Sequence, residues 1–284
     1  MEAMEISAKQ VMELRQATGM PMMQCKKALL EAEGDFEKAM ESLRKQGLKT
    51  AEKRQGRATG DGLLAVRISD DGKTGTMVLV LCETEPVKNT PKFIEFVDKL
   101  ADLAAERGLA DMDALSSTDF GDGETAESAL KNLVGLIGEN MQIGGVAHFN
   151  VEGEGVVGAY IHNDKKQGAL VALTGGADAD TAKEVCQHIV FAKPAVLSRD
   201  EIPQEDVDKE MAFLREQVAE DESMKNKPEQ AIEGNLQGRL NKNFFGSRVL
   251  NEQGWYREDN KKVAKVLEER GSAIQAFKYF APGA

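Results

Sequence analysis

Apolar residues recur at helical spacing in three short stretches near the start of the chain. The first follows Ser7 and Gln10, whose spacing is that of a capping box, in which each side chain satisfies an amide that the helix start leaves unpaired. The second stretch ends at Gly34 and the third at Gly47. The pattern therefore predicts a three-helix module at residues 1–48. Its inward faces are formed by apolar residues, namely Val11, Leu14, Ala28, Leu29, Ala32, Phe36, Ala39, Met40 and Leu43.

The chain changes character after this module. Between residues 44 and 60, six basic residues stand against a single acid, few positions are apolar and glycine is frequent. This composition is typical of a solvated connector, so we expect a basic linker at residues 49–60. A patch that binds nucleic acid or the ribosome is the alternative interpretation of the same charges.

Two stretches after the linker have the pattern of a β-hairpin. They are Leu63–Ser69 and Thr76–Leu81, and the turn between them lies around Gly72. A helix is expected next, because apolar residues recur at helical spacing between Pro91, a residue favoured in the first turn, and Gly108.

A similar order of elements recurs further along the chain. Strands are predicted at Ala147–Val151, Val156–His162 and Ala169–Thr174. A helix comes after them, opened by Thr181 and broken at Pro194.

The repetition indicates an α+β protein with two related subdomains at residues 61–145 and 146–284, each an antiparallel sheet backed by helices. Gly75–Leu81 in the first subdomain matches Gly168–Leu173 in the second, both in the spacing of apolar residues and in the helix expected after each segment. A helix around Ala126–Asn140 is placed between the two.

An insertion is predicted in the second subdomain. At about residues 203–244, apolar residues form two narrow seams separated by a turn at Lys225–Pro228, which indicates an antiparallel helical hairpin. The chain then returns as a helix over Asn260–Arg270 and a closing strand over Ala273–Phe280. The seams are formed by Val207, Met211, Leu214 and Val218, and by Ile232, Leu236 and Leu240.

The composition narrows the function classes. The chain has 36 Lys and Arg against 48 Asp and Glu, so its net charge of −12 disfavours direct binding of nucleic acid. No apolar run approaches the roughly 18 residues that a bilayer span needs, and the acidic start differs from a signal peptide. Three cysteines without a CxxC pair fit a reducing compartment. We therefore expect a cytoplasmic protein that does not bind membranes.

Candidate catalytic chemistry is sparse. Gly153–Gly158 matches the GxGxxG pattern of dinucleotide sites, but such a site needs a helix to begin there, and the next residues have the pattern of a strand. His148, His162 and His188 lack the spacing of metal ligands. We therefore expect no cofactor, no metal and no enzyme activity, and keep a dinucleotide-dependent enzyme as an alternative.

Three methionines stand in the turn before the second helix, at Met20, Met22 and Met23. A module of this size has room for one of them in its core. Methionine suits adaptable protein surfaces, so the others indicate a partner contact.

This methionine-rich segment also carries a family resemblance. Leu14–Leu29 resembles the N-terminal signature of bacterial translation elongation factor Ts over sixteen positions. The resemblance continues over nearly the whole chain, in Ile137–Asn140, Gln187–Pro194, Val207–Glu210, Lys227–Glu229 and Gly238–Lys242.

The resemblance implies a guanine-nucleotide exchange factor for the GTPase elongation factor Tu, promoting GDP release and GTP reloading during translation elongation. It implies a ubiquitin-associated-like N-terminal module, a coiled-coil hairpin, and binding to both nucleotide-free and GDP-bound elongation factor Tu. It also implies the residues that contact this partner. These are Arg15, Met22, Met23 and Lys26 near the nucleotide site, and Ile137, Gly138 and His188 against the nucleotide-binding domain.

One family signature differs in this chain. Most members read Glu-Thr-Asp-Phe-Val, and the acid and the aromatic ring intrude beside the switch region of the GTPase and disturb its magnesium site. Here the same place has Glu85 and Pro86, and proline offers less area than an aromatic wedge. A second departure is Gln253–Tyr256, where the family has a Pro-Phe pair. We expect Glu85 and Pro86 to contact elongation factor Tu, and two interpretations stay open: an exchange factor, or a diverged paralogue that binds without efficient exchange.

Overall fold

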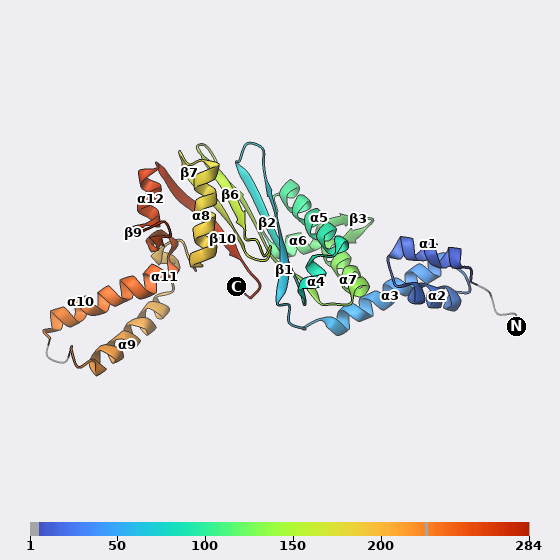
Figure 1. Ribbon diagram of the computed structural model, residues 1–284, viewed down its shortest axis with the longest axis horizontal. Helices are drawn as coiled ribbons and strands as arrows, with labels where there is room; N and C mark the ends of the chain where they lie inside the picture. The colour runs from blue at the N-terminus through green and yellow to red at the C-terminus, as the bar shows by residue number, and fades with distance from the viewer. Residues whose placement is uncertain (1–5, 225–226, 284) are drawn as a thin grey trace. The chain divides into compact units, whose positions relative to one another are not determined.

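The computed structural model describes residues 6–224 and 227–283, which form two compact units. Unit 1 contains the described residues up to Arg67, Met77–Ala147 and the described residues from Ala281, and unit 2 contains Ile68–Thr76 and His148–Phe280. Both units combine helices with small sheets, which confirms the predicted α+β class (Figure 1). The four-part division of the chain stays a prediction.

The three predicted N-terminal helices are confirmed as α1 (Ala8–Thr18), α2 (Met22–Glu31) and α3 (Phe36–Arg54). The capping box is present, since Ser7 Oγ accepts from the Gln10 amide at 3.2 Å and Gln10 Oε1 accepts from the Ser7 amide at 3.0 Å. The helices share one small core, formed by Val11, Leu14, Met20, Cys25, Ala28, Leu29, Ala39 and Leu43.

The sequence pattern predicted that the third helix ends at Gly47, and this prediction is wrong. It continues to Arg54, so half of the segment predicted as a basic linker is helical. Gly47 is buried where α3 crosses Gly135 of α7 (Ala126–Ile137), and a Cβ on Gly135 would overlap the Gly47 Cα. This glycine serves a close approach of two helices rather than a helix end.

The predicted hairpin forms two strands of a three-stranded sheet in the order β1-β2-β5. The hairpin consists of β1 (Asp61–Ile68) and β2 (Thr74–Cys82), and the third strand of the sheet is β5 (Met141–Asn150). The turn is confirmed, because the Ser69 amide donates to the Thr74 carbonyl at 3.0 Å and Gly72 adopts a φ of 68°.

Helices α5 and α7 complete the core of unit 1 with this sheet. Helix α5 (Pro91–Arg107) has the predicted proline in its first turn and ends at Gly108, whose φ is 62°. The smaller elements are α4 (Glu85–Lys88), α6 (Met112–Ser117), β3 (Asp119–Gly121) and β4 (Glu124–Thr125). The core side chains include Val78, Val80, Phe93, Phe96, Leu100, Leu115 and Met141.

Strand β5 corrects the predicted repeat. The strand expected at Ala147–Val151 begins six residues earlier, at Met141, and pairs in the first sheet instead of joining the later strands. Polar Gln142 and two glycines hide its start in the sequence. Gly144 is needed there, because a Cβ at that position would lie 2.8 Å from the Leu81 side chain.

Unit 2 contains the second sheet, in which three antiparallel strands lie in the order β10-β7-β6. These are β6 (Gly155–Ile161), β7 (Gly168–Gly175) and β10 (Ser272–Phe280). Strands β2 and β7, which contain the two similar sequence segments, are each the middle strand of their sheet.

Helix α8 (Ala179–Ala192) packs on this sheet and begins two residues before the predicted Thr181. The helix cap is Asp178, whose carboxylate accepts from the Thr181 amide at 2.8 Å. The predicted end is confirmed, since Pro194 comes directly after Lys193, which adopts a φ of 48°.

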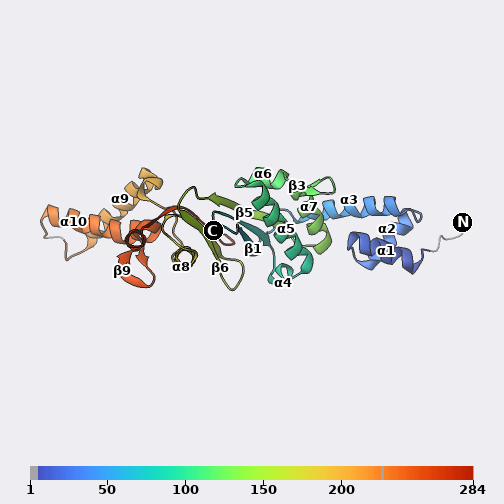
Figure 2. The same ribbon diagram turned by 90° about the horizontal axis from the view of Figure 1, so that it is seen from above.

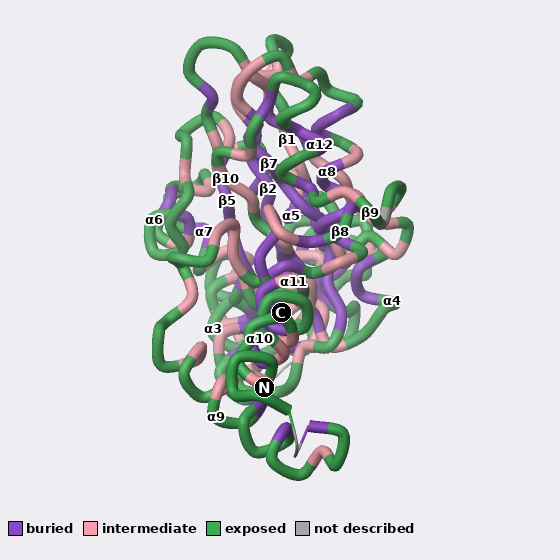
Figure 3. The backbone as a smooth tube through the Cα atoms, turned by 90° about the vertical axis from the view of Figure 1, so that its left-hand side faces the viewer, coloured by how far each residue is buried: buried purple, intermediate pink, exposed green. Residues whose placement is uncertain are grey.

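The helical hairpin is present in unit 2 as α9 (Gln204–Glu220) and α10 (Glu229–Arg239), and α10 leads into a π-helical segment, η2 (Leu240–Phe245). The predicted seams meet in one apolar cluster, which confirms the pairing of the two helices. Figures 1 and 2 show this pair extending from the remainder of unit 2, and Figure 3 shows its largely exposed backbone. Part of the predicted turn, at residues 225 and 226, lies outside the described residues.

The last helix is shorter than predicted. Residues before Val263 form the hairpin β8 (Gly254–Trp255) and β9 (Glu258–Lys262), and α12 spans Val263–Glu269. Strand β10 confirms the predicted closing strand. The remaining short segments are η1 (Arg199–Glu201), α11 (Gly246–Arg248) and η3 (Leu250–Glu252).

Candidate functional site

The methionine-rich turn divides its side chains between the core and the surface. Met20 is buried in the core of the N-terminal helices, whereas Met22 and Met23 open α2 and are exposed, Met23 to 75%. This separation confirms that the module takes one of the three methionines into its core. The two exposed thioethers lie at a helix start, and Arg15 on α1 and Lys26 on α2 are exposed too.

The exposed face of α2 extends further than the sequence reasoning recognised. Met23, Lys26 and Leu30 are spaced three and four residues apart, so they lie on one helix face, and Leu30 is exposed. Met12 on α1 is also exposed. Leu30 could have been identified from the sequence, because it is apolar and continues the helical spacing of Met23 and Lys26.

Glu85 and Pro86 form the first turn of α4 and are both exposed. Proline is well tolerated there, because a residue in the first turn of a helix needs no amide hydrogen. The other side of α4 is anchored: Val87 is buried, and Lys88 Nζ lies 3.2 Å from Asp61 Oδ1 and 3.4 Å from Glu85 Oε1. Burial acts to lower the pKa of Lys88, but the hydrogen bonds and charges of Asp61 and Glu85 outweigh it and raise the pKa.

The structure brings the start of α4 to the end of α7. Ile137 ends α7, and Gly138 caps it with a φ of 84°; both are half-buried. The carboxylate of the next residue, Glu139, accepts from the Thr84 amide at 3.1 Å and from the Thr84 hydroxyl at 2.8 Å. The segments that carry Glu85–Pro86 and Ile137–Gly138 are therefore joined directly.

A second carboxylate joins the same two segments. Glu83 Oε1 accepts from the Asn140 amide at 2.6 Å, and the Asn140 side-chain amide donates to the Arg57 carbonyl at 2.7 Å. The Arg57 and Arg54 guanidinium groups lie 3.6 and 3.9 Å from the Glu83 carboxylate. The hydrogen bond from Asn140 lowers the pKa of Glu83, and the two arginine charges lower it further.

The structure differs from the sequence expectation at His188. Its side chain is 1% exposed, so it offers almost no surface to a partner. Nδ1 accepts from the Tyr256 amide at 3.3 Å, which leaves the proton on Nε2 to be donated to Gln253 Oε1 at 3.0 Å. The ring stacks on Trp255 with centroids 5.3 Å apart. Burial lowers the pKa of His188, and the hydrogen bond to Gln253 opposes that shift.

The segment that departs from the family pattern at Gln253–Tyr256 thus packs around His188. Trp255 is fully buried and belongs to the apolar core of unit 2. Gln253 is buried too, and its amide nitrogen donates to the Ser247 carbonyl at 2.8 Å. These side chains fix the histidine ring rather than present a surface.

Phe191 is the exposed aromatic residue of the same helix, and the sequence reasoning did not single it out. It lies one turn after His188 on α8 and is 77% exposed. At this exposure the Phe191 ring is accessible to a partner. The sequence did contain a signal for the exposure of Phe191. The residue lies next to the turn at Lys193–Pro194, where the apolar face of α8 has ended.

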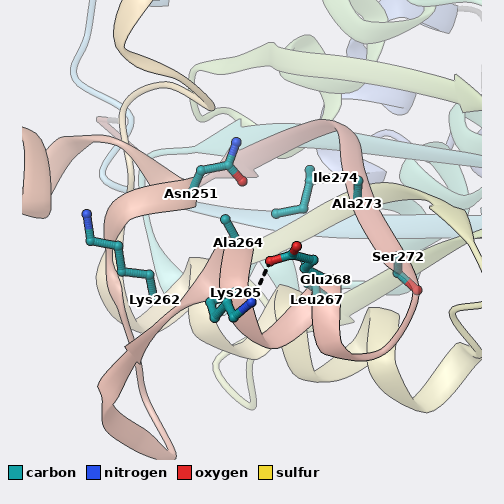
Figure 4. Close-up of a pocket in the computed structure, with 9 residues that line it drawn as sticks. All are labelled: Asn251, Lys262, Ala264, Lys265, Leu267, Glu268, Ser272, Ala273 and Ile274. Carbon is teal, nitrogen blue, oxygen red and sulfur yellow. Dashed lines mark hydrogen bonds and ion pairs between the residues drawn. The ribbon is translucent and has the colours of Figure 1, made fainter.

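The pockets are better described as surface hollows than as catalytic sites. One of about 480 Å³ lies between α12 and β10 in unit 2, and two of its charged residues, Lys265 and Glu268, pair with each other at 2.9 Å (Figure 4). A wider groove of about 1050 Å³ in unit 1 is lined by α1, α3, α5, α7 and β3.

Other predicted features can be placed directly. In Gly153–Gly158, the first two residues form a bend and the rest begin β6, so the helix that a dinucleotide site requires does not begin at this pattern. All three cysteines are free and buried. Within residues 6–224 and 227–283, no three His, Cys, Asp or Glu side chains are grouped to hold a metal ion. None of the helices in the described part of the chain has the length and apolar character to cross a bilayer.

Comparison with known proteins identifies the family. The family model described as elongation factor TS matches residues 83–284. A protein of Clostridium botulinum (strain Alaska E43 / Type E3) named elongation factor Ts is 37% identical over 282 residues, covering 96% of this chain and 91% of the relative. The elongation factor Ts of Prosthecochloris aestuarii is 35% identical, covering 97% of both chains. That of Alkalilimnicola ehrlichii is 37% identical, covering 96% of this chain and 91% of the relative. The chain therefore belongs to the elongation factor Ts family.

Proposed function

We propose that this protein is the guanine-nucleotide exchange factor of elongation factor Tu, promoting GDP release and GTP reloading during translation elongation in the cytoplasm. The observation that carries the proposal is the match to relatives named elongation factor Ts along 96% of the chain. A paralogue that binds without exchange has no support in these comparisons. The N-terminal helices are proposed to be ubiquitin-associated-like, and the protein is proposed to bind elongation factor Tu both with GDP and without nucleotide.

An exchange factor of this kind breaks no bond. It binds the nucleotide-free GTPase more tightly than the loaded one, and by linkage it weakens nucleotide binding by the same factor by which nucleotide weakens its own binding. A coupling of about 3 kcal/mol corresponds to a change of about 150-fold in nucleotide affinity.

In unit 1, we assign partner contact to two places. One is the N-terminal surface formed by Arg15, Met22, Met23 and Lys26, because exposed methionines adapt to a partner's shape and the two cations suit an acidic rim. The other is formed by Glu85 and Pro86 together with Ile137 and Gly138, which hydrogen bonds hold next to each other.

In unit 2, we assign the contact on α8 to Phe191 and give His188 a supporting role. Phe191 has the exposure that a contact needs, whereas the His188 ring is enclosed by Gln253, Trp255 and Tyr256. His188 then acts by fixing the end of α8 that presents Phe191.

At Glu85 and Pro86, the proposed contribution to nucleotide release is electrostatic. The exposed Glu85 carboxylate would face the magnesium and phosphate region of the GTPase, where a negative charge competes with the nucleotide phosphates for cations. Pro86 stiffens the turn that carries it, since its ring fixes φ.

The proposal is tested by stopped-flow release of fluorescently labelled GDP from elongation factor Tu, with excess unlabelled GDP and increasing amounts of this protein. We expect the release rate to rise and then saturate. Tight binding at an unchanged release rate would identify the non-exchanging paralogue instead. Failure to bind would remove both interpretations.

A further inference from the structure

The strand end that precedes α4 and the turn that comes after α7 are joined by reciprocal hydrogen bonds to two carboxylates. The Glu139 side chain accepts from the Thr84 amide and hydroxyl, and the Glu83 side chain accepts from the Asn140 amide. Each segment therefore provides one carboxylate and one backbone amide to the other, although they are more than fifty residues apart in the sequence. We call these four residues, Glu83, Thr84, Glu139 and Asn140, the carboxylate clamp.

Thr84 contributes its side chain to the clamp and not to the capping of its own helix. Thr84 is the N-cap residue of α4, yet its side chain makes no capping hydrogen bond, and its hydroxyl donates to Glu139. Here the hydroxyl is used to join α4 to the end of α7.

The clamp also reaches the end of α3. Asn140 donates to the Arg57 carbonyl, and the side chains of Arg54 and Arg57 approach Glu83. Two of the basic residues that the sequence placed in a solvated linker, Arg54 and Arg57, are therefore neighbours of the clamp. The hydrogen bond from Asn140 lowers the pKa of Glu83, and the two positive charges lower it further.

On this basis, we propose that the carboxylate clamp sets the spacing between Glu85–Pro86 and Ile137–Gly138, and that Glu139 and Thr84 are positioning residues for nucleotide release. The inference rests on the proposed exchange function. Groups that act on a partner's transition state must be held in place before binding, so loosening them lowers the maximum rate of release more than the affinity.

The test measures labelled-GDP release against concentration, which separates the maximum rate from the half-saturating concentration. In Thr84→Val the hydroxyl is lost at nearly constant shape, and in Glu139→Gln one acceptor oxygen becomes a donor. For each we expect the maximum rate to fall about tenfold, the size of effect that loss of one hydrogen bond to a charged group produces. The half-saturating concentration should change less than about threefold. A tenfold change would correspond to about 1.4 kcal/mol of binding free energy, so the expected change in affinity is smaller than that.

Two further variants separate positioning from general damage. Thr84→Ser keeps the hydroxyl and should retain the wild-type rate, and Glu106→Gln removes an exposed carboxylate of α5 without touching the clamp. The proposal is overturned if Thr84→Val and Glu139→Gln release GDP at the wild-type maximum rate, or if they lose affinity alone. If the wild-type protein itself fails to accelerate release, the proposed function fails rather than the clamp.

Discussion

At His188, burial and hydrogen bonding fix both the tautomer and the charge of one imidazole ring. The amide of Tyr256 occupies Nδ1, the Gln253 carbonyl oxygen receives the Nε2 proton, and Trp255 covers one face. A second proton on the ring would lie against the Tyr256 amide hydrogen. The folded protein therefore holds His188 neutral.

This neutral state predicts how stability depends on pH. Because burial lowers the pKa of His188 from its ordinary value of 6.5, the unfolded chain takes up a proton at a higher pH than the folded one. The contribution of His188 is complete above pH 6.5 and decreases as the pH falls towards its folded pKa. Urea unfolding between pH 7.5 and 5 should show a steeper loss of unfolding free energy for the wild type than for His188→Gln.

The matched control is Ile189→Val, a buried change on the same helix that leaves the histidine in place. It should be less stable at every pH, by about 1 kcal/mol, with the wild-type slope. Equal slopes for the wild type and His188→Gln would show that the ring does not titrate as described.

Residue roles could be predicted from the sequence only where local pattern decides them. Met20 and Met23 separate because one completes a helix core and the other begins a helix, and this choice depends on apolar spacing alone. The burial of His188 depends on Gln253 and Tyr256, more than sixty residues later. Nothing in the spacing of residues near His188 indicates those contacts.

At the scale of elements, α3 is the connection that matters most for the proposed site. It leaves the N-terminal core, passes Gly135 of α7 at Gly47 and ends beside the carboxylate clamp. Leu136 of α7 packs against the N-terminal core as well. The N-terminal surface is thus attached to the helix that ends in Ile137 and Gly138.

The two glycines at this crossing should respond differently to substitution by alanine. A Cβ on Gly135 would overlap the Gly47 backbone, whereas a Cβ on Gly47 would meet the Gly135 Cα at an ordinary 3.6 Å. Gly135→Ala should therefore lower the unfolding free energy by about 1–3 kcal/mol. Gly47→Ala serves as the control and should raise it by up to about 1 kcal/mol, because alanine favours a helix interior.

Thermal and urea unfolding of both variants measure these changes. A Gly135→Ala protein as stable as the wild type would mean that α3 and α7 do not approach as closely as described. Gly234 on α10 has open space around it, so Gly234→Ala gives the baseline effect of helix propensity on the unfolding free energy.

Elements with local start and stop signals were predictable, and those that depend on distant packing were not. The Ser7–Gln10 capping box, the turn at Gly72 and the end of α5 at Gly108 are all determined within short segments. Gly47 of α3 lies against Gly135, and Gly144 of β5 lies against Leu81, and both neighbours are distant in the sequence. A glycine needed for close packing looks the same in the sequence as one that ends a helix.

At the scale of the whole molecule, the proposed contacts are divided between the two compact units. Met23 represents the N-terminal surface of unit 1, and Phe191 represents α8 of unit 2. Residues that share no contacts lose binding free energy additively. The relatives match along nearly the full length of the chain, as expected if both units serve one partner.

Met23→Ala and Phe191→Ala should each weaken binding to nucleotide-free elongation factor Tu by about 1–2 kcal/mol. The double variant should lose the sum of the two effects within about 0.5 kcal/mol. Titration calorimetry measures all three affinities, and Met112→Ala, a less exposed methionine on α6, is the control. An unchanged affinity for Phe191→Ala would remove α8 from the proposed contact.

The uninterrupted course of α3 has a consequence for how this chain can change in length. Each helical residue advances the axis by about 1.5 Å and turns it by about 100°. One residue inserted between Leu43 in the N-terminal core and Gly47 would turn Met22 and Met23 to a different side of α7. Seven inserted residues would bring them back to within about 20° of their original direction. The direction in which this surface points is therefore set by helical phase, and a single insertion or deletion reorients it far more than a change of two whole turns does.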